Sequence, residues 1–340
     1  MSATKMKTLM LMLSDNPGIG GLEKHTRELA KEITALGHEV AVVAAPQHVE
    51  DLNGPTGFPI NANRSRNSLT LLISILRIIR AGNYEILHAQ GTKAAFVLQR
   101  LAPFIKRQVR IASIHGFKSR YPKAGAFHQL IAVSKALAND IAQPGVTVIY
   151  NGVSIAGQAP AQRPDGLDSP VWLAVGRLAP VKGFDFLIKA FQFCPGTLLI
   201  AGEGPEHQRL QSLINATGQS DKVKLLGFRT DVPALMSAAD GVVISSEREG
   251  FSYVCAEALI LGKPVISTNV PIANEILPKE HIFQGGEPAH FAALLQQNPA
   301  VLADSQAGAR AFAFNRLSLS AMASNTLEVY QKASKGLALN

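Results

Sequence analysis

Two glutamates, Glu249 and Glu257, flank the point where an apolar run, Gly241–Ser245, gives way to helical periodicity. Backbone N–H groups in the first turn of a helix lack partners within the helix and can bind an anion. Three residues would bring such groups to this turn: Gly250, Phe251 and Ser252. The second glutamate falls about one turn into the helix, where it could accept hydrogen bonds from a diol. From spacing alone, a favourable acid near a helix start and a surface glutamate remain the alternative.

A basic turn, Gly176–Gly183, follows another predicted strand, Val171–Val175. Arg177 offers a planar guanidinium and Lys182 a compact ammonium, and both groups suit a diphosphate. Phosphate-binding turns commonly follow the first strand of an open α/β sheet. An ordinary basic loop explains the same two residues, so the pair needs support from other features.

A glycine-rich turn that includes Gly20 and Gly21 follows the first predicted strand. It matches neither G-x-G-x-x-G nor G-x-x-x-x-G-K-[ST], and by itself it is a weak signal for phosphate binding. His115 follows the predicted strand Val109–Ile114 and could contact a sugar hydroxyl or a charge that develops at a reacting carbon. A lone histidine is more often structural, and we interpret His88 in that way.

No Asp-x-Asp pair occurs in the 340 residues. Such a pair would normally hold a divalent metal on a nucleotide diphosphate. Leaving-group charge would then have to be neutralised by Arg177, Lys182 and helix N-termini. Cys194 and Cys255 lie in no C-x-x-C context, so zinc is not expected either. We predict no metal site and no cofactor.

Strand and helix patterns alternate in two blocks separated by residues 151–170, which show no periodicity and are rich in Gly, Pro, Asp, Gln and Ala. Predicted strands in the first block are Lys7–Leu13, Glu39–Ala45, Tyr84–His88 and Val109–Ile114, and predicted helices are Leu22–Leu36, Leu69–Ile79 and Thr92–Leu101. Alternation at this spacing predicts α/β architecture with parallel sheets covered on both faces. We expect two Rossmann-like domains, residues 1–150 and 151–317, that face each other across a central cleft.

Positive charge is concentrated in the first half of the chain. Residues 1–150 contain 18 Lys and Arg against 9 Asp and Glu, whereas the remainder contains 15 against 16. Seven basic residues and no acid lie between Arg100 and Lys123. This stretch is either a solvated basic face or a surface that attracts anionic lipid headgroups or a phosphate-bearing acceptor. Nucleic acid is not an expected partner, because no aromatic residues are interleaved with the basic ones.

The expected location is the cytoplasm, with peripheral contact at the inner face of the cytoplasmic membrane as a hypothesis. The apolar run Thr8–Leu13 is too short for a secretory signal and precedes no small-residue cleavage site. Leu69–Leu76, the longest other apolar stretch, is far shorter than the roughly 20 residues of a membrane span. Two cysteines are compatible with a reducing compartment.

Taken together, these segments resemble the glycosyltransferase family 4 group of retaining enzymes with the GT-B fold. The most specific part is an E-x7-E motif, matched by Glu249 and Glu257. Further matches are Gly176–Gly183, Ile149–Val153 and Ala132–Ser134. The resemblance covers nearly the whole chain and reverses the structural interpretations given above for single motifs.

The resemblance also implies residue roles. Glu257 would bind the nucleotide ribose and Glu249 would lie at the donor sugar. The diphosphate would be held by Arg177 and Lys182, assisted by backbone amides near Phe251 and Ser252. Three residues of the first domain would complete the site: His115 near the donor hydroxymethyl group, and Gly20 and Gly21 beside the phosphates and acceptor. Ser252 departs from the family pattern, which more often has Gly or Pro there. The final helix, within residues 318–340, would return to the first domain.

The sequence therefore favours a metal-independent hexosyltransferase that uses a nucleotide-sugar, with UDP-sugar preferred over GDP-sugar. Its acceptor would be a saccharide or lipid-linked molecule in cell-envelope glycan (lipopolysaccharide or polysaccharide) synthesis. Two alternatives stay open: a nucleotide-sugar epimerase or NAD-dependent oxidoreductase, and a non-catalytic two-domain sugar-binding protein. Against the first, this chain lacks a complete glycine fingerprint and an acid after the second strand. The second leaves Arg177 and Lys182 without an anion.

Overall fold

The computed structural model describes residues 5–16, 18, 20–154 and 166–338. Contacts divide the chain into two compact units: unit 1 comprises residues 1–152 and 318–340, and unit 2 comprises residues 153–317. The predicted domain boundary between residues 150 and 151 lies two residues before this division. Residues 155–165 of the segment predicted to link the domains fall outside the described residues.

Unit 1 is built on a seven-stranded parallel sheet with the order β3-β2-β1-β4-β5-β6-β7. Its strands are β1 (Lys7–Met12), β2 (Glu39–Ala44), β3 (Thr56–Pro59), β4 (Ile86–Gln90), β5 (Val109–Ile114), β6 (Gln129–Ala132) and β7 (Val146–Val148). The strand order reverses between β1 and β4, and ligands of open α/β sheets bind outside the carboxyl ends of the strands at such a point.

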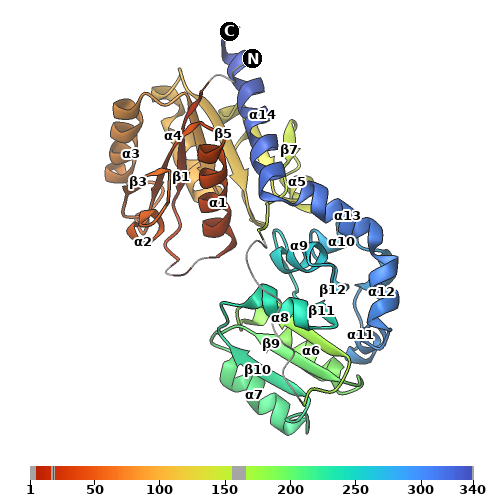
Figure 1. Ribbon diagram of the computed structural model, residues 1–340. Coiled ribbons are helices and arrows are strands. Elements are labelled where there is room, and N and C mark those ends of the chain that lie inside the picture. Colours follow the sequence, from red (N-terminus) through yellow and green to blue (C-terminus); the bar gives the residue numbers. More distant parts are fainter. Residues whose placement is uncertain (1–4, 17, 19, 155–165, 339–340) are drawn as a thin grey trace. The chain divides into compact units, whose positions relative to one another are not determined.

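Six α-helices cover this sheet: α1 (Gly21–Ala35), α2 (Pro46–Val49), α3 (Leu69–Gly82), α4 (Thr92–Leu101), α5 (Lys135–Ile141) and α14 (Leu319–Ala338). Helix α1 begins at Gly21, where the carboxylate of Glu23 folds back and its Oε2 accepts the backbone N–H of Gly20 at 2.9 Å. Helices α1 and α14 lie side by side (Figure 1). Met322 and Tyr330 of α14 are fully buried in the unit 1 core with Met10.

Unit 2 is built on a six-stranded parallel sheet with the order β10-β9-β8-β11-β12-β13. Its strands are β8 (Val171–Val175), β9 (Thr197–Ala201), β10 (Val223–Gly227), β11 (Gly241–Ile244), β12 (Val265–Thr268) and β13 (Ile282–Phe283). The order reverses between β8 and β11, so the loops that follow these two strands meet at a second switch point.

The helices of unit 2 are α6 (Phe184–Phe191), α7 (His207–Ala216), α8 (Val232–Ala238), α9 (Tyr253–Ile260), α10 (Ala273–Ile276), α11 (Pro288–Leu295), α12 (Pro299–Ser305) and α13 (Ala307–Arg316). Trp172 of β8 is fully buried in a core with Phe191 of α6 and Phe291 of α11. The α/β class with two parallel sheets, predicted from the strand and helix patterns, is confirmed.

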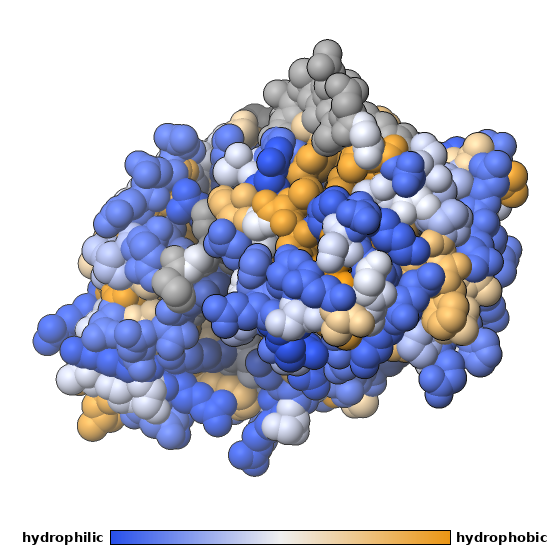
Figure 2. All heavy atoms as spheres, turned by 90° about the horizontal axis from the view of Figure 1, so that it is seen from below, coloured by the Kyte–Doolittle hydropathy of each residue, from blue (hydrophilic) through white to orange (hydrophobic). Residues whose placement is uncertain are grey.

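Most of the face seen from below is hydrophilic, with smaller areas of hydrophobic residues (Figure 2). This surface agrees with a chain whose large apolar side chains are mostly buried in two cores. Within the described ranges, no helix combines the length and the apolar character that a membrane span requires.

Candidate active site

Hydrogen bonds join the loop after β8 to the loop after β11 at the switch point of unit 2. Ser245 Oγ donates to the carbonyl oxygen of Lys182 at 2.8 Å, and the N–H of Glu247 donates to the carbonyl oxygen of Val181 at 2.9 Å. Gly183 adopts φ +62°, and a Cβ atom there would lie 2.2 Å from the carbonyl oxygen of Ser245. Only glycine fits this close approach in a left-handed conformation.

The two loops bring Lys182 and Glu249 together, 67 residues apart in sequence. Lys182 Nζ lies 3.0 Å from Glu249 Oε1, and the side chains are 24% and 10% exposed, respectively. A cation and a carboxylate are thus held side by side and partly shielded from water. Such a pair can present positive charge to a phosphate and hydrogen-bond acceptors to an adjacent hydroxyl-bearing group.

Helix α9 begins directly after this pair. Ser252 is fully buried and caps the helix, its Oγ accepting the N–H of Cys255 at 3.4 Å. The departure from the family pattern at this position therefore has a structural role. Phe251 is buried and its ring contacts that of Tyr253 at a centroid distance of 5.1 Å. Glu257 lies in the second turn of α9 and is half-buried.

Two other predicted residues of these loops take no part in the ion pair. Gly250 is half-buried between Glu249 and the start of α9. Arg177 belongs to the same loop as Lys182, but its side chain is exposed. This side chain makes no hydrogen bond or ion pair with the described part of the chain. Lys182, Glu249 and the α9 start thus form the assembled centre, and Arg177 lies on the rim of the same loop.

Unit 1 places Gly20, Gly21 and His115 at the carboxyl edge of its sheet. Gly20 is the N-cap of α1 and Gly21 is the first helical residue. His115 directly follows β5 and is half-buried, and its Nε2 lies 3.0 Å from Gln90 Oε1 at the end of β4. All three predicted residues therefore lie near the switch point between β1 and β4.

His115 is one of three histidines, His25, His88 and His115, that we call the histidine cluster. The rings of His25 and His115 meet edge to face, with centroids 4.4 Å apart. Burial lowers the pKa of His25 to about 4, and the nearby side chain of Asn151 opposes this shift. Burial lowers the pKa of His88 to about 3 and that of His115 well below its usual value. All three imidazoles are therefore neutral near pH 7.

His88 is fixed from both sides, as the structural interpretation predicts. Its Nδ1 lies 2.6 Å from the hydroxyl of Tyr330 in α14, and its Nε2 lies 2.8 Å from Ser113 Oγ in β5. Burial raises the pKa of Tyr330 above its usual value, so the phenol stays protonated. In contrast, Nδ1 of His115 is buried without a hydrogen-bond partner among the described residues.

Sequence reasoning missed His25 and Gln90, both of which contact His115. His25 lies one turn into the helix that follows the glycine-rich turn, and Gln90 ends a strand that we predicted to stop at His88. Both lie near the carboxyl ends of predicted strands, which is the signal that could have identified them.

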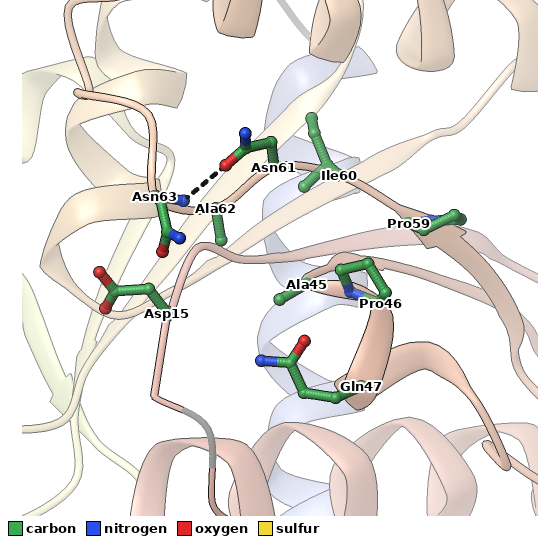
Figure 3. Close-up of a pocket in the computed structure, with 9 residues that line it drawn as sticks. All are labelled: Asp15, Ala45, Pro46, Gln47, Pro59, Ile60, Asn61, Ala62 and Asn63. Carbon is green, nitrogen blue, oxygen red and sulfur yellow. Dashed lines mark hydrogen bonds between the residues drawn. The ribbon is translucent and has the colours of Figure 1, made fainter.

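A separate hollow of about 460 Å³ opens at the carboxyl ends of β1, β2 and β3 in unit 1. Its polar groups belong to Asp15, Gln47, Asn61 and Asn63, whose side chains surround it in Figure 3. Asn61 Oδ1 accepts the N–H of Asn63 at 3.1 Å. Amide and carboxylate groups around an open space can exchange hydrogen bonds with several hydroxyl groups of a ligand.

Within the described residues, no three His, Cys, Asp or Glu side chains are grouped as metal ligands would be. The ammonium of Lys182 supplies the positive charge of the assembled centre in unit 2. A ligand phosphate there would meet a lysine and the first turn of a helix.

Two parallel α/β units, each with its own switch point, are the architecture of the GT-B glycosyltransferases. Solved structures share this fold. A glycosyltransferase from Rickettsia africae aligns with a TM-score of 0.82 at 20% identity over 98% of this chain and 100% of that one. HepE from Anabaena, in complex with UDP and glucose, aligns with a TM-score of 0.77 at 25% identity over 96% and 100%, respectively.

The chain belongs to the family 4 and group 1 glycosyltransferases. The model of Glycosyltransferase Family 4 matches residues 19–156, and that of Glycosyl transferases group 1 matches residues 158–298. An uncharacterised glycosyltransferase of Methanocaldococcus jannaschii is 30% identical over 81% of this chain and 83% of that protein. The lipopolysaccharide core biosynthesis glycosyltransferase LpsD of Rhizobium meliloti is 25% identical over 92% and 95%, respectively. The resemblance stated from the motifs is confirmed.

Proposed function

We propose that this glycosyltransferase moves a hexosyl group from a nucleotide-sugar to a saccharide or lipid-linked acceptor in cell-envelope glycan synthesis. A UDP-sugar is the preferred donor and a GDP-sugar the second candidate. Support for the pathway comes from the lipopolysaccharide core relative in Rhizobium meliloti. Support for the nucleotide comes from the structural similarity to HepE, whose solved structure contains UDP and glucose.

The observation that carries this proposal is the Lys182–Glu249 pair beside the first turn of α9. As the diphosphate leaves, its negative charge would be stabilised by the Lys182 ammonium and by backbone amides near Phe251 and Ser252. Glu249 would then lie at the donor sugar. This arrangement supplies charge stabilisation from protein groups, and the proposed transfer therefore needs no metal. The proposed transfer keeps the anomeric configuration, as the family resemblance implies.

The remaining roles follow the family resemblance. Glu257 would bind the ribose diol and Arg177 would approach the diphosphate from the rim of its loop. His115 would contact the donor sugar, and its neutral imidazole can donate as well as accept a hydrogen bond. Gly20 and Gly21 would let phosphate or acceptor approach the start of α1.

A thermal-shift series with UDP, GDP, ADP and NAD tests the nucleotide. A ligand at 100 times its Kd stabilises the folded state by about 2.7 kcal/mol, which corresponds to an increase in Tm of about 5–10 °C for units of this size. We expect the largest shift with UDP. A shift with NAD alone would contradict the proposal and favour an oxidoreductase.

Two substitutions test the centre of the site. We expect Glu249→Ala to abolish sugar transfer, and Lys182→Ala to weaken nucleotide binding more than it alters folding. Lys189→Ala and Glu280→Ala, which replace exposed residues of unit 2, serve as matched controls and should leave both properties unchanged. A fully active Glu249→Ala enzyme would refute the assignment.

We also propose a cytoplasmic location with peripheral contact to anionic membrane through unit 1. Helix α3 carries two exposed apolar residues, Leu69 at 74% and Ile73 at 48% exposure. Arg77 and Arg80 follow at helical spacing on the same exposed face. An exposed apolar stripe with adjacent arginines is the pattern of a helix that binds a charged interface.

Sedimentation with vesicles at physiological salt tests this contact. We expect binding to phosphatidylglycerol vesicles, weaker binding to phosphatidylcholine vesicles, and reduced binding of Ile73→Glu. Val301→Glu replaces an apolar residue of unit 2 that is 64% exposed and should bind as the unmodified protein does. Equal binding to both kinds of vesicle would remove the proposal.

A further inference from the structure

Unit 1 contains a second hollow, of about 510 Å³, that the proposed donor site does not use. Four cationic side chains line it: Arg66, Lys93, Lys118 and Arg120. Phe96 and the hydroxyl residues Thr92 and Ser119 complete the lining. The residues come from three places in the sequence, namely the segment before α3, the first turns of α4 and the loop after β5. We call this space the cationic hollow.

Two of the cations are held by contacts with neighbouring groups. Lys93 Nζ donates to the carbonyl oxygen of Ala62 at 2.5 Å, and the Arg66 guanidinium lies 4.2 Å from the centre of the Phe96 ring. A cation stacked on an aromatic ring loses little conformational freedom when it also binds a ligand. Both side chains therefore keep hydrogen-bond donors at defined positions next to the hollow.

The loop after β5, which carries Lys118 and Arg120, is also fixed. The N–H of Lys118 donates to the hydroxyl of Tyr121 at 3.0 Å, and that hydroxyl donates to Asp140. Burial, together with the hydrogen bond to Asp140, raises the pKa of Tyr121 to about 12. The carboxylate of Asp140 is therefore engaged by a tyrosine instead of neutralising the nearby cations.

Charge in the cationic hollow is uncompensated. Within the described part of the chain, none of its four cations forms an ion pair. Four like charges around one space repel each other, and an anion between them would relieve this repulsion. Gly91, the N-cap of α4, provides no side-chain cap, so the first N–H groups of this ten-residue helix add to the positive potential.

The cationic hollow adjoins the hollow of Figure 3, which is surrounded by Asp15, Gln47, Asn61 and Asn63 and which we call the amide-lined hollow. Ala62 lines the amide-lined hollow, and its carbonyl oxygen accepts the hydrogen bond from Lys93, which lines the cationic one. One space thus offers neutral hydrogen-bonding groups and the next offers cations. A sugar ring bearing a phosphate combines hydroxyl groups with an anion and matches both.

We propose that the acceptor is a phosphate-bearing saccharide, with its sugar in the amide-lined hollow and its phosphate in the cationic hollow. This inference rests on the proposed function, because it assigns the acceptor of the same transfer. Arginine and lysine donors bind phosphate oxygens through charge-assisted hydrogen bonds, and arginine can do so through two parallel bonds. Uncharged acceptors would leave the four cations without a counterion.

Calorimetric titration with inorganic pyrophosphate tests the cationic hollow in the full chain. The protein is first saturated with UDP, so that the nucleotide site is occupied. UDP binding itself reports on the proposed function, and the pyrophosphate titration reports on the hollow, so the two can fail separately. The double variant Lys118→Ala/Arg120→Ala removes two exposed cations of the hollow. Its matched control, Arg100→Ala/Arg107→Ala, removes two exposed cations of unit 1 outside it.

We expect pyrophosphate to bind the UDP-saturated protein, and about tenfold more weakly in the Lys118→Ala/Arg120→Ala variant. The control pair should retain the affinity within a factor of two, and both variants should keep the unmodified Tm. If both double variants weakened pyrophosphate binding equally, the binding would reflect only the general electrostatic field of unit 1, and the proposal would be overturned. An unchanged affinity in the Lys118→Ala/Arg120→Ala variant would overturn it as well.

Vesicles of phosphatidylglycerol distinguish a saccharide phosphate from a lipid headgroup. If the phosphate is carried by a saccharide, both double variants reduce vesicle binding equally, because they remove the same charge. A loss of vesicle binding confined to Lys118→Ala/Arg120→Ala, with no pyrophosphate site in the unmodified protein, would assign the hollow to lipid and refute the saccharide phosphate.

Discussion

Replacing Gly183 by alanine tests whether the loops after β8 and β11 are held in register by a close backbone contact. The added Cβ would lie 2.2 Å from the carbonyl oxygen of Ser245, and the residue adopts φ +62°. One of the two backbones must therefore move, and with it the neighbouring Lys182 and its ion pair with Glu249.

Two costs contribute to the effect of this substitution. A left-handed conformation costs an alanine about 1–2 kcal/mol, and forcing an atom into occupied space typically costs about 1–3 kcal/mol more. Gly218 provides a matched control, since it adopts φ +67° with nothing within 4 Å of its Cβ position. Gly218→Ala therefore carries the first cost without the second, and the difference between the two variants isolates the contact.

Urea unfolding followed by the fluorescence of Trp172 measures this difference. Trp172 is the only tryptophan of the chain and is fully buried in the unit 2 core, so its emission reports on that unit. At a slope of about 2 kcal/mol per molar urea, we expect the midpoint of Gly183→Ala to lie about 0.5–1.5 M below that of Gly218→Ala. UDP affinity should fall only in Gly183→Ala.

Equal midpoints for the two variants would refute the reasoning, because they would show that the loop accommodates a methyl group at no cost. Unchanged UDP affinity in a destabilised Gly183→Ala protein would separate loop packing from nucleotide binding. In that case the Lys182–Glu249 pair would not depend on the contact between Gly183 and Ser245.

Three further predictions concern buried groups. Burial lowers the pKa values of the histidine cluster, so between about pH 6.5 and 4 these imidazoles take up protons only when unit 1 unfolds. The free energy of unfolding of unit 1 should therefore fall by up to about 1.4 kcal/mol per pH unit for each histidine as the pH is lowered. Hydrogen exchange of unit 1 peptides at pH 7 and pH 5 measures this change. Tyr330→Phe removes the hydroxyl that contacts Nδ1 of His88, and α14 peptides should lose about 1–3 kcal/mol of protection. Burial raises the pKa of Cys194 to about 12 and that of Cys255 further, so a thiol reagent at pH 8 should label neither cysteine in the folded protein and both in urea.

The fold class and most elements of the described chain could be predicted, because they depend on local periodicity. The helix predicted over Leu22–Leu36 is observed over Gly21–Ala35, and the strand over Val109–Ile114 has the predicted bounds. The edge strand Thr56–Pro59 was missed, since its Gly and Pro are unfavourable in strands. Its pairing with β2 is a tertiary contact that sequence periodicity does not show.

Strand ends limited the prediction of the site. The apolar run of β4 suggested an end at His88, but pairing with β5 extends the strand to Gln90. Gln90 then reaches His115 at 3.0 Å. Asn151, assigned to the linker from composition, is buried in unit 1 beside His25. Such contacts depend on which strands become neighbours, and that information is not local.

The interior of unit 1 needs residues from both ends of the described chain, whereas unit 2 is one continuous segment. The N–H of Val153 donates to the carbonyl oxygen of Leu317 at 2.8 Å, so unit 2 begins and ends at adjacent points. During synthesis, unit 2 can complete its packing as soon as residue 317 has emerged from the ribosome. The core of unit 1 cannot be completed before Met322 and Tyr330 have been synthesised. The core of the half that is translated first is therefore the last to be completed, and until then the strands that α14 covers lack part of their packing.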